Sequence, residues 1–247
     1  MGHTIADMLS DYLCLQGKAV LDMGCGDGGI SIGLAERGAK VVGIDYDSNS
    51  IGLARRKAEE HNIAVDFFVN DAEGTELANN SFDVIVCNAV IEHVFHPERL
   101  AGEIARLLKP GGILFLDTPN RYSILQLISD THYNLFGISI MPRWMAAYYI
   151  VKIRGIRKYS VADLRTYEFL KNIFGSKGIV FLADANISNL VKQLTGKMPI
   201  PRFGLRSHII YSLNRLHLSW ILISFVKSWF YRTFITSGWS LIGKKVK

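Results

Sequence analysis

Residues 20–28 read Val-Leu-Asp-Met-Gly-Cys-Gly-Asp-Gly, and this stretch decides the fold of the 247-residue chain. Its first three residues end a short apolar strand. The turn that follows contains three glycines, which can approach a ligand closely because they carry no Cβ: Gly24, Gly26 and Gly28. A helix is expected over residues 28–38 and a second strand over residues 40–45. This order is typical of a βαβ unit, which binds its ligand at the carboxyl ends of its strands.

An acidic residue ends the second strand. Asp45 lies 21 positions after Gly24, and a ribose-binding carboxylate is expected about 20 positions after such a turn. The spacing therefore predicts a nucleoside site. The competing interpretation of Asp45 is a helix N-cap.

The charge of the glycine turn indicates which nucleoside binds. Asp22 and Asp27 flank the glycines, and no Lys or Arg lies between Lys18 and Arg37. A dinucleotide presents a pyrophosphate, which nearby acids would repel from a helix N-terminus. S-adenosylmethionine instead offers a ribose, a sulfonium and an ammonium, without phosphate. The turn therefore predicts S-adenosylmethionine and argues against a dinucleotide-dependent oxidoreductase.

Five segments follow one another along the chain: LDMGCGDG at 21–28, GIDYD at 43–47, Asn70-Asp71-Ala72, FDVIVCNAVIEHV at 82–94 and LLKPGGILFLDTPN at 107–120. In this order they resemble the motifs of a known family, the class I S-adenosylmethionine-dependent methyltransferases. The likeness covers residues 18–118 and points to the branch that includes quinone-biosynthesis O-methyltransferases and bacterial glycan and lipid methyltransferases.

This resemblance implies roles for individual residues. Asp45 would accept hydrogen bonds from the ribose hydroxyls, and Asp71 would accept one from the adenine amino group. Asp22 would act less directly, by orienting the turn or the cofactor's ammonium through water. A plain turn residue is the competing interpretation of Asp71. The cofactor-binding residues expected on this basis are Asp22, Gly24, Gly26, Gly28, Asp45, Tyr46, Asp71, Ala72 and Asn88.

The segment Glu92-His93-Val94-Phe95-His96 follows the fourth expected strand. His93 is the candidate catalytic residue, because an imidazole can deprotonate an acceptor hydroxyl near neutral pH. The alternative is that His93 only fixes the loop by hydrogen bonds. Glu92, His93 and His96 could also bind a metal, as in RNA 3′-end methyltransferases. Their motif has a further Glu where this chain has Ala89, so no metal site is predicted.

Alternating apolar runs and helical periods predict an α/β fold with a doubly wound, parallel sheet. Six strands are expected at 18–22, 40–45, 65–70, 82–88, 111–117 and 178–183. Residues 238–245 look like the seventh, antiparallel strand that closes the sheet of the family that the chain resembles, which makes the sheet mostly parallel. Helices are expected at 4–15, 28–38, 48–61 and 97–108. A further helix is expected from Val161 to Phe174, with Ser160 as its N-cap. We interpret the whole chain, 1–247, as one domain with a cofactor-binding core at 18–118 and helical insertions at 119–158 and 186–236.

The two halves of the chain differ in charge. Residues 1–118 hold 9 Lys and Arg against 18 Asp and Glu, whereas residues 119–247 hold 19 against 4. The second half also holds 20 of the 27 aromatic residues. Basic and aromatic residues mixed with bulky aliphatic ones favour an anionic membrane surface over nucleic acid. A buried helical lid over the active site is an equally good interpretation. The basic residues concerned are Arg143, Lys152, Arg154, Arg157 and Lys158.

Residues 216–235 are predicted to form a helix that lies on the surface. A bilayer span needs about 20 apolar residues, whereas the longest stretch here without Lys or Arg is 216–226. The three cysteines show no paired spacing and indicate reduced thiols in the cytoplasm, and no signal peptide is expected. The sequence thus predicts a cytoplasmic, peripherally membrane-bound enzyme. It would transfer a methyl group from S-adenosylmethionine to an oxygen of a lipid-linked glycan, a lipid or a quinone precursor. An RNA methyltransferase, another small-molecule methyltransferase and a non-catalytic cofactor-binding regulator are the alternatives.

Overall fold

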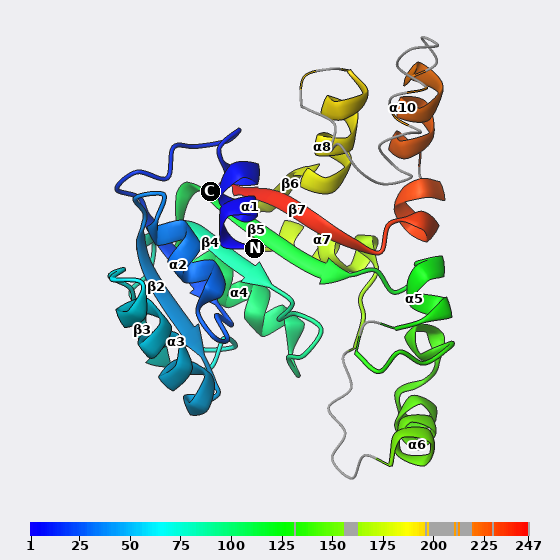
Figure 1. The fold of residues 1–247 in the computed structure, drawn as a ribbon, viewed down its shortest axis with the longest axis horizontal. Helices are drawn as coiled ribbons and strands as arrows, with labels where there is room; N and C mark the ends of the chain where they lie inside the picture. The colour runs from blue at the N-terminus through cyan, green and yellow to red at the C-terminus, as the bar shows by residue number, and fades with distance from the viewer. Residues whose placement is uncertain are drawn as a thin grey trace.

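The computed structural model describes residues 1–130, 132–155, 163–195, 197, 210, 212, 219–228 and 230–246, apart from the side chains of Arg143 and Arg232. A single sheet of seven strands lies at the centre, with helices on both of its faces (Figure 1). This arrangement confirms the doubly wound α/β fold expected from the sequence. The basic positions Arg157 and Lys158 and the expected cap Ser160 lie outside the described residues.

The strand order of the sheet is β3-β2-β1-β4-β5-β7-β6. All neighbours are parallel except β7, which runs antiparallel to both β5 and β6, as expected. The order reverses between β1 and β4, and such a switch point opens a crevice at the carboxyl ends of the strands. The strands are β1 (Ala19–Met23), β2 (Lys40–Asp45), β3 (Asp66–Val69), β4 (Phe82–Asn88), β5 (Leu108–Pro119), β6 (Ile179–Asp184) and β7 (Gly238–Lys245).

In the part of the chain that the structure describes, six helices accompany the strands, and the last of these begins the second insertion. Five further elements lie in the two insertions. The first group is α1 (Gly2–Leu9), α2 (Gly29–Ala35), α3 (Ser48–Glu60), α4 (Pro97–Leu107), α7 (Tyr167–Gly175) and α8 (Ala185–Leu194). The second is α5 (Ile124–Ile128), η1 (Ile138–Ile140), α6 (Arg143–Arg154), α10 (Ser219–Lys227) and η2 (Tyr231–Ile235). Among the described residues, no helix has the length and apolar character that crossing a membrane requires.

Both faces of the sheet are buried, because successive side chains of a strand point to opposite faces. Leu21 and Ile85 belong to the core cluster that includes residues of α4 and α7. Val20 and Val84 belong to a second cluster that includes residues of α1. The near-continuous apolar runs of β1 and β4 follow from this double burial.

Several expected boundaries are wrong, among them those of two helices and one strand. The helix expected from Val161 begins at Tyr167, because the side chain of Thr166 caps it by accepting the Phe169 N–H. The first helix ends at Leu9 instead of residue 15, since the chain turns there to reach β1. The fifth strand begins at Leu108, where it already pairs with Phe82 before an irregularity in the register.

Candidate functional site

The glycine turn after β1 is held against β2 and against the loop after β4. Gly24 and Cys25 both donate their N–H groups to the carbonyl of Ile44. Gly24 has a φ of +75°, and a Cβ there would lie 2.3 Å from Val90 Cγ2. A Cβ on Gly26 would meet no atom within 4 Å. The turn is therefore closed at Gly24 and open at Gly26, where a ligand can approach the backbone.

The carboxylate of Asp45 joins the turn to the next helix. Its Oδ2 accepts the Gly26 N–H at 2.9 Å, and its Oδ1 accepts the Asp47 N–H at 3.0 Å. An ionised carboxylate offers about four lone-pair sites. Asp45 therefore retains acceptor capacity for a vicinal diol. The N-cap interpretation of Asp45 is wrong, because Asp47 caps α3 by accepting the N–H groups of Asn49 and Ser50.

The two acids that flank the turn differ in their surroundings. Asp22 is buried, and its Oδ2 accepts the Ser31 hydroxyl at 2.5 Å. Burial raises the pKa of Asp22 to about 6. Asp27 instead forms an ion pair with Lys57 of α3, whose hydrogen bond lowers the pKa of Asp27. The negative charge that the sequence assigns to the turn is thus partly neutralised by a lysine 30 positions away.

The other expected cofactor residues follow the carboxyl ends of β2, β3 and β4. Tyr46 is 83% exposed beside Asp45. Asp71 is exposed and accepts the Glu73 N–H at 2.9 Å, while Ala72 is half-buried against the core. Asn88 is half-buried at the end of β4. These residues, the turn and Asp45 share one edge of the sheet, as expected, and their contacts with a cofactor remain a prediction.

The loop after β4 is anchored from two sides. Ala89, with a φ of 54°, donates its N–H to the carbonyl of Asp117. Glu73 Oε1 accepts the N–H groups of Phe95 and His96, at 2.7 and 3.1 Å. Glu73 was not predicted as part of the site, because no local pattern in the sequence links it to a loop more than 20 positions later. These bonds fix the backbone on either side of Glu92 and His93.

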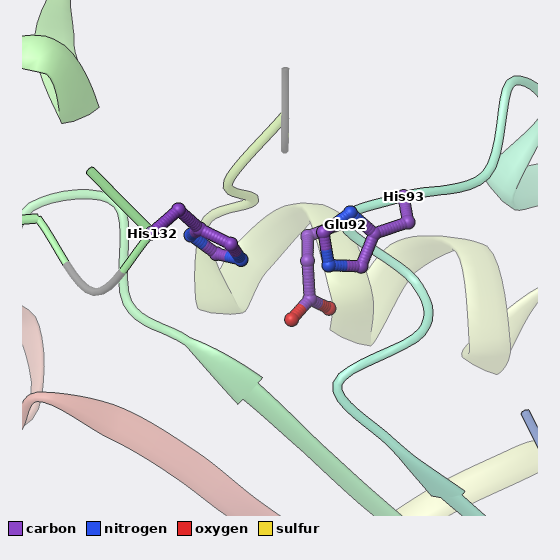
Figure 2. A group of neighbouring side chains, drawn as sticks. All are labelled: Glu92, His93 and His132. Carbon is purple, nitrogen blue, oxygen red and sulfur yellow. The ribbon is translucent and has the colours of Figure 1, made fainter. Parts of the chain in front are cut away.

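Figure 2 shows Glu92 and His93 together with His132 of the 119–158 insertion. One ligand atom from each of the three lies within 4.8 Å of the others. Glu92 is 1% exposed, and burial raises its pKa to about 7. Burial and then the nearby His132 lower the pKa of His93. His96 does not join this group; it is the N-cap residue of α4.

Comparison with known proteins relates the core to a family. Residues 21–116 match a family described as methyltransferase domain. This part of the chain is thus similar to methyltransferase domains. The matched segment begins in β1 and ends in β5, so it contains the glycine turn, Asp45, Asn88 and His93.

Similar proteins are found by sequence and by structure. The ubiquinone biosynthesis O-methyltransferase of Azoarcus sp. (strain BH72) is 40% identical over 116 residues, which cover 47% of this chain and 50% of that protein. The chain thus spans about half the length of the curated relatives it matches. A putative sarcosine dimethylglycine methyltransferase from Galdieria sulphuraria covers 100% of the chain, and the chain covers 85% of it, with a TM-score of 0.60 and 16% identity. Magnesium protoporphyrin IX methyltransferase from Synechocystis PCC 6803, solved with S-adenosylhomocysteine, has a TM-score of 0.54 and 22% identity, over 74% of this chain and 73% of that one. These structures share the fold.

The buried carboxylate of Asp22 predicts a pH-dependent stability difference. Because its pKa is raised from 3.8 to about 6, the stability that Asp22 contributes is fully present below pH 3.8 and is lost as the pH rises to about 6. Asn at this position cannot titrate. The free energy of unfolding of Asp22→Asn, relative to that of the wild type, should therefore rise by up to about 3 kcal/mol as the pH increases across that window. Urea unfolding at a series of pH values measures this difference.

Asp27→Asn is the matched control for Asp22→Asn. Since Lys57 lowers the pKa of Asp27, the control should lose stability relative to the wild type at neutral pH, which is the opposite sign. If the difference in free energy of unfolding between Asp22→Asn and the wild type does not change with pH, the raised pKa of Asp22 is contradicted.

Proposed function

We propose that this protein transfers a methyl group from S-adenosylmethionine to an oxygen of an amphipathic or membrane-associated acceptor. The Asp45 carboxylate carries the cofactor part of the proposal. Asp45 is the last residue of β2, and its carboxylate accepts the N–H of Gly26, where the backbone is open. A ribose diol would be bound there. The oxygen acceptor rests on the resemblance to relatives named as ubiquinone biosynthesis O-methyltransferases.

The reaction needs an acceptor oxygen aligned with the sulfonium methyl group. The oxygen forms a bond to the methyl carbon while the carbon–sulfur bond breaks, and the electron pair stays on sulfur to give S-adenosylhomocysteine. The acceptor's hydroxyl proton leaves to a base or to water. His93 follows the end of β4, and we propose that it assists this deprotonation. Most of the rate would come from positioning the two reactants, for which effective molarities reach about 10⁵–10⁸ M.

An exposed apolar surface on the insertions supports an amphipathic acceptor. In α6, Ala146 and Ile150 are buried, while other large side chains of the same helix are exposed. In Figure 1, α5 and α6 lie beyond the carboxyl end of β5, away from β2 and β3. The exposed residues of α5, α6 and α10 include Ile124, Leu125, Ile128, Trp144, Tyr148, Ile153, Trp220, Ile221 and Phe225.

Two measurements test the reaction. Calorimetry should detect binding of S-adenosylmethionine and S-adenosylhomocysteine, and no binding of NAD. Incubation with methyl-labelled S-adenosylmethionine should then place label in a lipid extract and not in total RNA. NAD binding would contradict the cofactor. Label in RNA would contradict the acceptor class, and cofactor binding without any methylated product would indicate a non-catalytic regulator.

The basic half of the chain predicts binding to anionic membranes. Vesicles containing anionic lipid should bind the protein, binding should weaken as salt rises, and neutral vesicles should bind it poorly. Because no described helix is long and apolar enough to span a bilayer, an alkaline wash should release the protein. Retention through that wash would indicate a span outside the described residues.

A charge reversal on α6 locates this surface. Lys152→Glu should weaken vesicle binding about 5- to 30-fold, since each charge near an anionic surface contributes about 1 kcal/mol. Lys171→Glu on α7 is the control, because Lys171 is also exposed but lies outside the insertions and contacts Glu168. Equal losses in both variants would mean that only the total charge of the protein matters.

A further inference from the structure

We propose that Glu92, His93 and His132 bind one divalent transition-metal ion beside the expected acceptor site. One ligand atom from each residue lies within 4.8 Å of the other two (Figure 2). Glu92 and His93 come from the loop after β4, and His132 comes from the loop between α5 and η1. The site would therefore join the core of the chain to the 119–158 insertion.

Glu92 is a second, independent observation in favour of a ligand. Its side chain is 1% exposed, and its Oε2 accepts the hydroxyl of Thr118 at 3.0 Å. Its Oε1 is also buried and has no hydrogen-bond partner. A buried carboxylate oxygen without a partner is costly to desolvate. A cation held between Glu92 and the two imidazoles would satisfy it.

The spacing of the three side chains favours an ion over a chain of hydrogen bonds. A proton relay needs a donor and an acceptor about 2.6–3.2 Å apart, and Glu92 Oε1 accepts no such bond. Ligand atoms around a tetrahedral zinc ion lie roughly 3.4 Å apart, because each bond is about 2.1 Å long. Small side-chain rotations from the present spacing would reach that geometry.

The imidazole of His132 lies beside a carboxylate. Its Nδ1 lies 3.8 Å from an oxygen of the buried Asp130. Asp130 in turn accepts the backbone N–H groups of His132, Tyr133 and Leu135, at 2.9–3.2 Å. A carboxylate beside one imidazole nitrogen is the usual partner of a histidine that binds a metal through the other nitrogen.

The ligand set selects the class of metal. Imidazole nitrogens suit zinc and other transition metals, whereas magnesium and calcium prefer oxygen ligands. Three protein ligands also leave at least one coordination position open. If the proposed methyl transfer is right, that position would receive the acceptor oxygen, and His93 would assist deprotonation through the metal and not as a free base.

Metal binding can be tested without an acceptor. The metal-stripped protein should bind one Zn²⁺ or Co²⁺ per chain in calorimetry, and Co²⁺ should show the absorption bands of a nitrogen-ligated ion. His132→Ala and Glu92→Gln should each weaken binding by about 10²-fold or more, since each removes one of three ligands. His96→Ala is the control and should bind as the wild type does, because His96 lies outside the group.

Calorimetry with S-adenosylhomocysteine shows in the same preparations whether each variant is folded, and it tests the cofactor assignment separately from the metal. A folded wild-type protein that binds neither ion at micromolar concentration would overturn the metal site. Unchanged metal binding in folded His132→Ala would overturn it as well. Either result would leave the methyltransferase proposal intact.

Discussion

S-adenosylmethionine is expected to bind the Asp45→Asn variant about 10²-fold more weakly than the wild type. The carboxylate would accept two charge-assisted hydrogen bonds from the ribose, each contributing about 1.5–3 kcal/mol. An amide oxygen carries no full charge, and the amide nitrogen would oppose one of the two hydroxyl donors. Calorimetry with S-adenosylmethionine and S-adenosylhomocysteine measures the loss, which should be similar for both ligands because they share the ribose.

The effect of Asp45→Asn must be separated from a collapse of the turn. Asp45 also accepts the N–H groups of Gly26 and Asp47, so the variant should lose some thermal stability. Asp27→Asn removes a charge from the same turn, but from a side chain already paired with Lys57. We expect it to change cofactor affinity by less than about threefold. Unchanged affinity in Asp45→Asn, or equal losses in both variants, would contradict the ribose-binding role.

The fold was predictable because its signals are local. Glycines after β1, an acid after β2 and the apolar runs of β4 and β5 each mark one strand end or one strand. The antiparallel β7 was expected on a different ground, because residues 238–245 look like the strand that closes the sheet in the family that the chain resembles. The start of α7 was misplaced, because the polar side chain of Thr166 caps that helix six residues after Ser160, the cap that the sequence suggested.

The Glu92–His93–His132 group was predictable only where its residues lie in one segment. Local spacing suggested His96 as a neighbour of Glu92 and His93. Glu73 instead holds the N–H groups of Phe95 and His96, and α4 begins at the next residue. His132 takes the third position from an insertion about 40 residues further along the chain. No periodicity in the sequence links residues at that separation.

His93→Ala is expected to lower the rate of methyl transfer by about 10²–10⁴-fold, with cofactor affinity nearly unchanged. The loss should occur whether His93 accepts the acceptor's proton directly or binds a metal that polarises the acceptor oxygen. The cofactor should still bind, because the turn and Asp45 hold their contacts without the His93 side chain. Single-turnover transfer of labelled methyl to the lipid extract measures the rate, and calorimetry measures the affinity.

A purely structural His93 would give a different pattern. The melting temperature would fall, and cofactor binding would weaken together with activity. His96→Ala is the matched control, since it removes a histidine from the same loop without touching the Glu92–His93–His132 group; its rate should stay within about threefold of the wild type. Free imidazole added to His93→Ala separates the two chemical roles. It should restore part of the rate if His93 is a direct base, and much less if the variant has lost a metal ion. Equal activity in His93→Ala and the wild type would exclude His93 from the mechanism.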